Sequence, residues 1–209
     1  MEFQAEIIRT IQSAATPALD MIFEGITMLG EDFFIIFVAT LIYWCFSKEI
    51  GYWICWCLSF GNVFINTVKC IFRIDRPIGY EGIRTLREHT APGYSFPSGH
   101  THASSNFFFS AAKAFNKKWF WGIAIVIPAF VGLSRLYLGV HWPMDVVCGY
   151  IIGLLIPLLL WKIYKKFSER KAFLALLQLI FPFIRTLISP RNWRAFLQRS
   201  LKYRLAITL

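Results

Sequence analysis

Residues 119–161, WFWGIAIVIPAFVGLSRLYLGVHWPMDVVCGYIIGLLIPLLLW, contain two apolar runs that flank a short polar turn, and this pattern decides the fold. Each run is near or above the length of about 18 apolar residues that a membrane-spanning helix needs. Outward from this stretch, similar runs predict spans near residues 28–47, 50–71, 101–116, 119–140 and 144–162. We therefore predict an all-α fold, a polytopic membrane helical bundle of about five to six transmembrane helices.

The composition agrees with a membrane protein. Of 209 residues, 56% are hydrophobic and 16% are charged, whereas an average soluble domain has about 25% charged residues. Residues 1–19 lack a basic start followed by an apolar block, so no cleavable signal peptide is expected. The five cysteines lie in or at the ends of predicted spans, and their odd number argues against a disulfide framework. Cys55 and Cys57 point to different faces of a helix, so we expect no metal site there.

Basic residues between the spans indicate how the chain is oriented. If the spans alternate, one side of the membrane collects Lys48, Lys113, Lys117, Lys118, Lys162, Lys165, Lys166, Arg170 and Lys171. The positive-inside rule makes that side cytoplasmic, so the polar clusters described below face the extracytoplasmic side. This topology and a phosphate site account for most of the net charge of +10. No basic helix stands outside the spans, which argues against a nucleic-acid partner.

The chain divides into three predicted regions: an amphipathic interfacial segment, a transmembrane core, and a basic, partly apolar extension on the cytoplasmic face, at residues 1–27, 28–165 and 166–209. The first region has an apolar helix face made by Ile7, Ile8 and Ile11. In the extension, an apolar run at 172–188 is interrupted by Gln178, Pro182 and Arg185. If this run crossed the membrane, the basic tail that follows it would lie outside, against the positive-inside rule, so we expect a re-entrant or surface hairpin on the cytoplasmic face.

The second predicted span carries a polar stripe. Its members are spaced by 4, 3, 4 and 3 residues and so share one helix face: Asn62, Asn66, Lys69, Arg73 and Arg76. Pro77 forces the residue before it out of helical geometry and ends the stripe. Lys69 and Arg76 are then expected two turns, about 10 Å, apart on that face. Cations at a helix end also reach toward the membrane interface, so the stripe alone does not define a site.

The second cluster, Pro97-Ser98-Gly99-His100, precedes the predicted helix at 101–116. Ser98 is expected to cap this helix, and Gly99 lets an anion approach the backbone closely. The free N–H groups and the positive end of the helix dipole would then face a phosphate.

We expect structural or surface roles for two other histidines, His102 and His89. His102 lies two residues beyond His100, about 200° further round the helix, and is expected to face away from it. His89 lies in the preceding loop. Neither is predicted to take part in chemistry.

The third cluster joins the last two predicted spans. Arg135 ends one helix, and His141 precedes Trp142-Pro143, a favourable helix start with proline in the first position. Asp145 lies in the first turn of that helix, within reach of one ring nitrogen of His141. Such a hydrogen bond would fix the tautomer and leave the other nitrogen free as a nucleophile. In isolation, the pair is equally explained as a local bond at a helix end.

Together the clusters supply three cations, a helix start and two histidines, a set suited to binding a phosphate and cleaving its ester. Their pattern, K-x-x-x-x-x-x-R-P, then P-S-G-H, then S-R-x-x-x-x-x-H-x-x-x-D, resembles the signature of the type 2 phosphatidic acid phosphatase superfamily. These are membrane lipid phosphatases related to soluble haloperoxidases and acid phosphatases. The resemblance covers residues 26–165 and implies a helical bundle with its active site at the extracytoplasmic membrane edge. Many members have six spans, the first of which is here replaced by the amphipathic segment.

The resemblance also implies a role for each residue. The phosphate would be held by Lys69, Arg76, Ser98, Gly99 and Arg135. His141 would attack phosphorus to form a phosphohistidine, Asp145 would orient it, and His100 would protonate the leaving oxygen. No metal or other cofactor is expected, because the cations neutralise the charge on the phosphate. Arg73 is our own addition, as a headgroup contact, because it shares the stripe.

The expected substrate is a lipid phosphomonoester or diphosphate in the cell membrane. The family implies undecaprenyl diphosphate, phosphatidic acid, phosphatidylglycerophosphate or a sphingoid-base phosphate. The sequence leaves a homodimer open. A lipid phosphotransferase that uses the same residues, and a non-enzymatic lipid transporter or scramblase, also stay open. Haloperoxidase chemistry is disfavoured, because those relatives are soluble and this chain is not.

Overall fold

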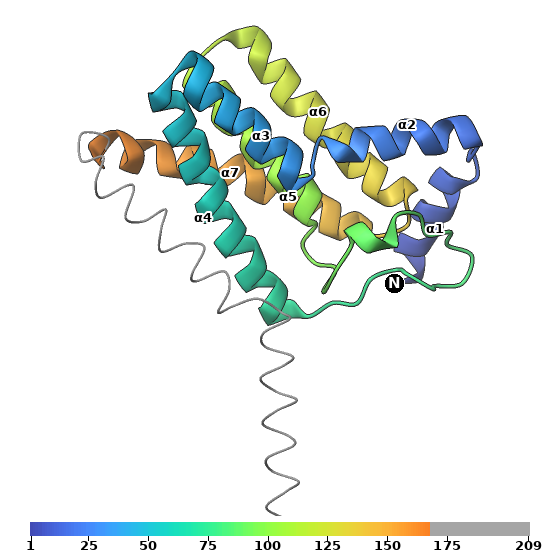
Figure 1. Ribbon diagram of the computed structural model, residues 1–209. Coiled ribbons are helices and arrows are strands. Elements are labelled where there is room, and N and C mark those ends of the chain that lie inside the picture. The colour runs from blue at the N-terminus through green and yellow to red at the C-terminus, as the bar shows by residue number, and fades with distance from the viewer. Residues whose placement is uncertain (168–209) are drawn as a thin grey trace, which may run out of the picture.

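The computed structural model describes residues 1–167, and this part of the chain is helical without strands. Its elements are α1 (Glu2–Gln12), α2 (Pro17–Met28), α3 (Asp32–Leu41), the π-helical turn η1 (Ile42–Phe46), α4 (Lys48–Phe72), the 3-10 turn η2 (Glu88–Thr90), α5 (Gly99–Phe115), α6 (Lys118–Tyr137) and α7 (Pro143–Phe167). The predicted all-α fold is confirmed (Figure 1). Nearly all of the predicted extension at 166–209 lies outside the described residues.

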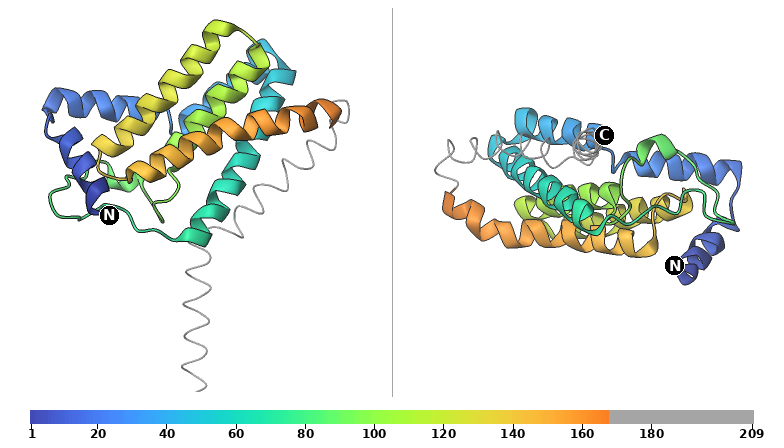
Figure 2. Two further views of the ribbon diagram at one scale, coloured as in Figure 1. Left: turned by 180° about the vertical axis from the view of Figure 1, so that it is seen from behind. Right: turned by 90° about the horizontal axis from the view of Figure 1, so that it is seen from below.

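Helix α5 forms the centre of the bundle. It packs against α4, α6 and α7 and runs between the latter two in Figure 2. Small residues allow this close approach: a Cβ atom placed on Gly153 of α7 would lie 2.5 Å from the Cβ of Ser105. Glycines and serines at such contacts are typical of helices packed inside membranes. The segment predicted as a span at 101–116 is therefore the innermost helix of the bundle.

Within residues 1–167, three helices are long and apolar enough to cross a membrane: α4, α6 and, as far as Lys166, α7. Helix α2 and the α3–η1 segment meet the same conditions only as a pair, with a bend of 51° between them. The predicted spans at 50–71, 119–140 and 144–162 thus correspond to single helices. The one predicted at 28–47 corresponds to α3 with η1, entered through the bend at Gly30.

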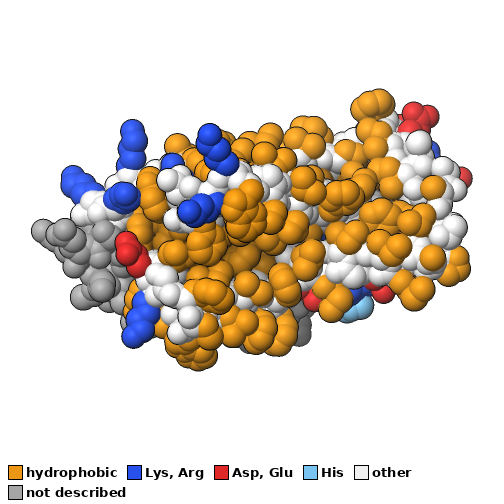
Figure 3. All heavy atoms as spheres, turned by 90° about the horizontal axis from the view of Figure 1, so that it is seen from above, with side chains coloured by type: hydrophobic (Ala, Val, Ile, Leu, Met, Phe, Trp, Pro, Cys, Tyr) orange, Lys and Arg blue, Asp and Glu red, His pale blue; other side chains and the backbone are white. Residues whose placement is uncertain are grey.

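Cationic side chains gather at one end of a largely apolar molecule (Figure 3). Lys48 begins α4, Lys118 begins α6, and Lys165 and Lys166 lie in the last turn of α7. The opposite ends of these three helices carry the polar clusters. The orientation in which the lysines are cytoplasmic stays a prediction.

The N-terminal region forms two helices where a single amphipathic helix was expected. Thr16 caps α2 by accepting a hydrogen bond from the Leu19 N–H at 3.3 Å, and Pro17 occupies the first helical position, where it needs no donor. Helix α1 packs Ala5 and Ile8 against Ile83 and Trp142 in a small separate core. The N-terminus therefore covers the long loop between α4 and α5, and its interfacial location stays a prediction.

Candidate active site

The loop after α4 departs from the predicted helical stripe. Helix α4 ends at Phe72, and Arg73 adopts a left-handed conformation with φ 50°. The stripe was expected to continue to Arg76 on one helix face, and that expectation is wrong. A spacing pattern along the chain does not predict the loop carbonyl groups that hold the Arg76 side chain.

Arg76 is held by a ring of carbonyl oxygens. Its guanidinium donates hydrogen bonds of 2.9–3.3 Å to the backbone of Pro92, Gly93, Tyr94 and Val140. Its Nη1 atom also lies 2.9 Å from Nε2 of His141. An arginine can only donate hydrogen bonds, so Nε2 of His141 must accept and carries no proton. Arg76 thereby links the long loop to the histidine.

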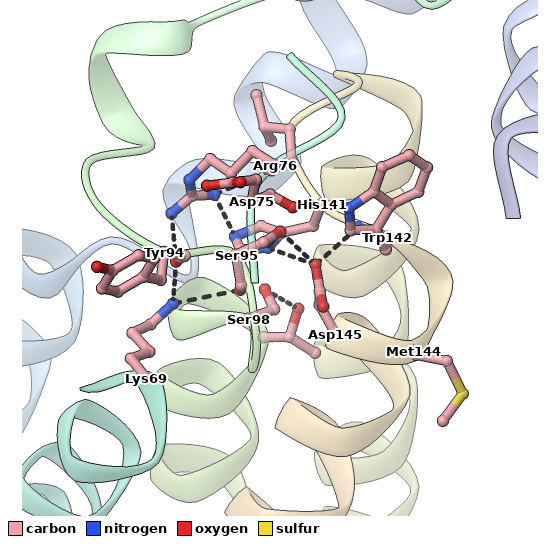
Figure 4. A network of polar contacts seen from close by, with 12 residues as sticks. Lys69, Asp75, Arg76, Tyr94, Ser95, Ser98, His141, Trp142, Met144 and Asp145 are labelled. Carbon is pink, nitrogen blue, oxygen red and sulfur yellow. Dashed lines mark hydrogen bonds and ion pairs between the residues drawn. The ribbon is translucent and has the colours of Figure 1, made fainter. Parts of the chain in front are cut away.

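His141 is oriented from its other ring nitrogen. Nδ1 lies 3.3 Å from Oδ2 of Asp145, four residues further along the chain (Figure 4). Because Nε2 accepts from Arg76, the ring proton is on Nδ1, and it is donated to the carboxylate. The predicted His141–Asp145 pair is thus present, with Nε2 as the nitrogen that carries no proton. His141 is buried, with 1% of the residue exposed.

Asp145 is itself fixed by two further donors. Its Oδ2 accepts a hydrogen bond from the Trp142 N–H at 2.8 Å and another from the hydroxyl of Ser95. Ser95 Oγ also lies 3.4 Å from Nδ1 of His141. Ser95 was absent from the sequence predictions. It lies 50 residues from Asp145 in a loop without periodic structure, so no local pattern could have identified it.

Lys69 approaches the same cluster from the last turn of α4. Its Nζ donates to Tyr94 O at 2.8 Å and to Ser95 O at 3.3 Å (Figure 4). The residue is 8% exposed, and it lines a cavity that Arg76 and His141 also line. These carbonyl contacts hold the ammonium group beside the place where a phosphate would meet His141.

The start of α5 forms another wall of this cavity. Ser98 precedes the helix as predicted, but its hydroxyl pairs with Thr101 Oγ1 at 2.9 Å and does not cap a backbone N–H. A Cβ atom on Gly99 would meet no other atom within 4 Å, so there is room for an anion at this backbone. His100 lines the cavity, and its Nε2 has no hydrogen-bond partner within residues 1–167.

Arg135 is fully buried behind the cavity. Its guanidinium donates to the hydroxyls of Thr27 at 3.0 Å and Thr90 at 3.4 Å, and of these three residues only Thr90 lines the cavity. Sequence reasoning missed both threonines, because Thr27 and Thr90 lie 108 and 45 residues from Arg135 in the chain. Arg135 itself does not line the cavity, and its predicted role in holding a phosphate stays a prediction.

The remaining candidates fall into two groups. Arg73 is exposed at the end of α4 and does not line the cavity. Its side chain donates a hydrogen bond to the backbone oxygen of Cys70, in the same helix, at 2.9 Å. His102, which was expected to face away from His100, lines the same cavity, and this correction follows from the cavity extending along α5 toward α4. His89 lies in η2. No group of three metal-binding side chains occurs within residues 1–167.

The cavity has a volume of about 620 Å³ and extends well beyond the phosphate-binding cluster. Its far part is lined by residues of α3 and α4, two helices that are joined by η1 and diverge toward the C-terminal end of α4 (Figure 1). Gly30 sets this geometry, because a Cβ there would lie 2.8 Å from the backbone oxygen of His100. The missing side chain lets the bend before α3 rest directly on α5.

Burial and nearby cations shape the electrostatics of the site. Removal from water, and then Arg76 and Lys69, lower the pKa of His141 well below its ordinary value of 6.5. Burial and then Arg135 do the same to the pKa of His100. Burial lowers the pKa of Arg76 to about 10, so it keeps its charge at neutral pH. The resting site thus combines two neutral histidines with fixed positive charge.

Comparisons with known proteins place the chain in a family. The model of the PAP2 superfamily matches residues 50–169. The chain belongs to the PAP2 superfamily. It is 31% identical over 170 residues to phosphatidylglycerophosphatase B of Bacillus subtilis, covering 74% of this chain and 77% of that protein. It is 27% identical over 152 residues to undecaprenyl-diphosphatase of Sulfolobus acidocaldarius, covering 72% and 73%.

A solved structure has the same fold. The crystal structure of a transmembrane PAP2 type phosphatidylglycerolphosphate phosphatase from Bacillus subtilis matches with a TM-score of 0.68 and 25% identity, over 79% of this chain and 86% of that one. The predicted family is confirmed. The prediction that the chain is a lipid phosphate phosphatase is confirmed with it. The roles of the individual site residues stay predictions.

Proposed function

We propose that the protein hydrolyses a phosphomonoester or diphosphate of a membrane lipid through a phosphohistidine on His141, without a metal. One observation carries the proposal: Nε2 of His141 bears no proton and points at Arg76, while Nδ1 is held by Asp145. A phosphate bound by Arg76 would present its phosphorus to this nitrogen. Positioning of this kind supplies much of the catalysis of phosphoryl transfer.

The first step forms a bond between Nε2 of His141 and phosphorus while the phosphorus–oxygen bond to the lipid breaks. His100 donates its proton to the leaving oxygen, and the lipid alcohol departs. The histidine ring becomes positively charged as it attacks, and Asp145 stabilises this charge. Lys69 and Arg76 stabilise the negative charge on the transferred group.

The second step reverses these roles. His100, now without its proton, takes one from a water molecule, and the resulting hydroxide attacks phosphorus. The bond between phosphorus and Nε2 breaks, inorganic phosphate leaves, and His141 is neutral again. His100 holds the water's proton and is ready for another substrate.

His100 must be protonated before the first step, although burial and the surrounding cations lower its pKa in the empty site. A bound phosphate dianion brings two negative charges into the same cavity. Opposite charge nearby favours the protonated imidazole, so substrate binding raises the pKa of His100. Substrate binding itself thus favours the protonated form of His100, the general acid.

The site is proposed to face the extracytoplasmic side of the cell membrane, with the lysine-rich end of the bundle in the cytoplasm. The support is the distribution of Lys48, Lys118 and Lys166 at the helix ends opposite His141. A lipid would place its phosphate at His141 and its tail between α3 and α4, where Ile36 and Leu58 are among the apolar residues that line the cavity. Cysteine labelling at either end of α6 in intact cells tests this orientation.

The test of the function is phosphate release by the purified protein in detergent. The panel includes phosphatidic acid, phosphatidylglycerophosphate, undecaprenyl diphosphate and a sphingoid-base phosphate, with His141→Ala as control. Release above the control from at least one lipid is expected, and none from any of them would overturn the proposal. Separately, labelled phosphate should be trapped on the wild type by rapid acid quench and be absent from His141→Ala.

Two other functions are separated by the same samples. A phosphotransferase would release little free phosphate, because it passes the phosphoryl group to a second lipid alcohol and turns over only when that acceptor is supplied. A transporter or scramblase would move lipids equally well in the His141→Ala variant. The proposed hydrolase requires neither an acceptor nor transport, and it requires Nε2 of His141.

A further inference from the structure

Two asparagines of α4 line the cavity beyond the phosphate-binding cluster. Asn66 and Asn62 lie one and two turns before Lys69, and all three face the cavity. At 1.5 Å per residue they are about 4.5 Å and about 10 Å from Lys69 along the helix axis. The proposed chemistry does not use them.

The hydrogen bonds of this pair leave specific atoms without protein partners. Asn66 Nδ2 donates to the backbone oxygen of Asn62 at 2.7 Å and to its Oδ1 at 2.6 Å, which uses both of its hydrogens. The bond to a backbone oxygen fixes which end of Asn66 is the NH₂ group. Oδ1 of Asn66 and Nδ2 of Asn62 then have no protein partner within residues 1–167. An acceptor and a pair of donors are thus available to the cavity.

Such groups are costly inside a membrane. An amide that has neither water nor a hydrogen-bond partner in hydrocarbon is destabilised by the loss of its hydrogen bonds. A third polar group adds to them, because His102 lines the same cavity and its Nε2 has no hydrogen-bond partner in the described part of the chain. A ligand that supplies hydrogen-bonding atoms at this depth would remove the cost.

Beyond Asp32, which begins α3, the wall of the cavity formed by this helix is apolar. Phe33 and Ile36 of α3 line it and are 83% and 60% exposed on the outer surface. A bound lipid would meet hydrocarbon on the α3 side and amides on the α4 side. This asymmetry fits a chain that carries polar atoms for its first few bonds and only hydrocarbon afterwards.

We propose that Asn62 and Asn66 select lipid phosphates that have a polar backbone, such as glycerol or a sphingoid base, over polyprenyl phosphates. This inference rests on the proposed function. A hydroxyl, amine or amide N–H near the phosphate donates to Asn66 Oδ1. A carbonyl or hydroxyl oxygen further along accepts from Asn62 Nδ2. A polyprenyl chain has only carbon at these positions and leaves both amides unpaired.

The experiment compares lipid monophosphates with and without polar atoms beside the phosphate: lysophosphatidic acid and sphingosine 1-phosphate against farnesyl phosphate. The ratio of kcat/KM is measured for the wild type, for Asn62→Leu and for Asn66→Leu. The matched control is Thr67→Val, since Thr67 lies on the same helix but does not line the cavity. Its hydroxyl donates to the backbone oxygen of Val63 at 2.9 Å. Binding is measured in parallel as thermal stabilisation of the His141→Ala protein, alone and combined with each leucine variant.

The wild type is expected to prefer the polar-backbone lipids. Each leucine variant should lower that preference by about five- to tenfold, mainly by losing activity on the polar lipids. Thr67→Val should keep the wild-type ratio. A ratio that does not change in either leucine variant, or a wild type that prefers farnesyl phosphate, would overturn the inference.

Failure of the proposed function gives a different result. If no lipid releases phosphate, the hydrolase proposal falls, and stabilisation by the same lipids still decides the role of the asparagines. If the leucine variants do not unfold cooperatively, the same ratios of kcat/KM are measured for Asn62→Ala and Asn66→Ala instead. Unequal preference between lysophosphatidic acid and sphingosine 1-phosphate tells which polar backbone is used.

Discussion

The two ends of the cavity are built on opposite principles. At the phosphate end, Arg76 and Asp145 are tied by several hydrogen bonds each to the backbone or to buried side chains. At the tail end, the amides of Asn62 and Asn66 keep unused atoms, and α3 presents exposed apolar side chains. The comparison indicates that the chemistry is fixed before substrate arrives, whereas the choice of lipid depends on groups that the substrate itself must satisfy.

The largest effect is expected from His141→Ala at the phosphate end. Loss of the attacking nitrogen removes the covalent route, so phosphate release should fall by more than about 1,000-fold. The variant should still bind lipid phosphates, because Lys69 and Arg76 remain. Measurement of kcat together with lipid-dependent melting separates these effects, and substantial turnover in the variant would contradict the mechanism.

Arg76→Lys should have the next largest effect. A lysine keeps the charge but cannot donate to His141 and to the loop carbonyls at the same time. We expect a fall in kcat/KM of about 100- to 1,000-fold, the cost of losing one donor to a transition-state charge. Arg9→Lys is the control, since Arg9 pairs with Glu2 away from the cavity. Near wild-type activity in Arg76→Lys would show that this end is less rigid than described.

Ser95→Ala tests whether a residue that does not touch the phosphate still determines catalysis. Removing its hydroxyl takes one donor from Asp145 and should lower kcat by about 10- to 100-fold with little change in KM. Ser104→Ala is the matched control, because that buried hydroxyl has no partner within residues 1–167. An equal loss in both variants would mean that the effect comes from packing and not from positioning.

The pH dependence should reflect the lowered pKa of His141. The nucleophile must be neutral, and burial with the nearby cations disfavours its protonated form. Activity is therefore expected to persist below pH 6.5, and kcat/KM should decline by about tenfold per pH unit only once the lowered pKa is passed. A rate profile in detergent checks this. An acid limb that begins at or above pH 6.5 would contradict the described electrostatics.

The smallest effect is expected at the tail end, from Ile36→Trp. The larger ring narrows the space between α3 and α4, so KM for a long-chain lipid phosphate should rise by about three- to fivefold while kcat changes little. A short-chain analogue should be unaffected. Phe37→Trp is the control, because Phe37 is exposed on the same helix but does not line the cavity. Equal effects on short and long chains would place the tail elsewhere.

These differences also explain which parts of the molecule were predictable. The pairing of His141 with Asp145 depends on a four-residue spacing at a helix start, which local geometry determines. The location of α4, α6 and α7 followed from hydrophobic runs. The contacts of Arg135 with Thr27, and of Asp145 with Ser95, join segments 108 and 50 residues apart, and no periodic pattern relates such segments. Arg76 was wrongly predicted to lie on the face of α4, because the helical spacing was extended past Phe72, where the helix ends.

The N-terminal helix has a consequence for how the protein is made. Gln4 accepts a hydrogen bond from the backbone N–H of Met144, a residue 140 positions later in the chain. Ribosomes add about 5–20 residues per second, so α1 waits about 7–30 seconds before its partner has been synthesised. During that interval the long loop lacks its cover, and the site cannot reach its final form. Docking of α1 is therefore one of the last events of assembly.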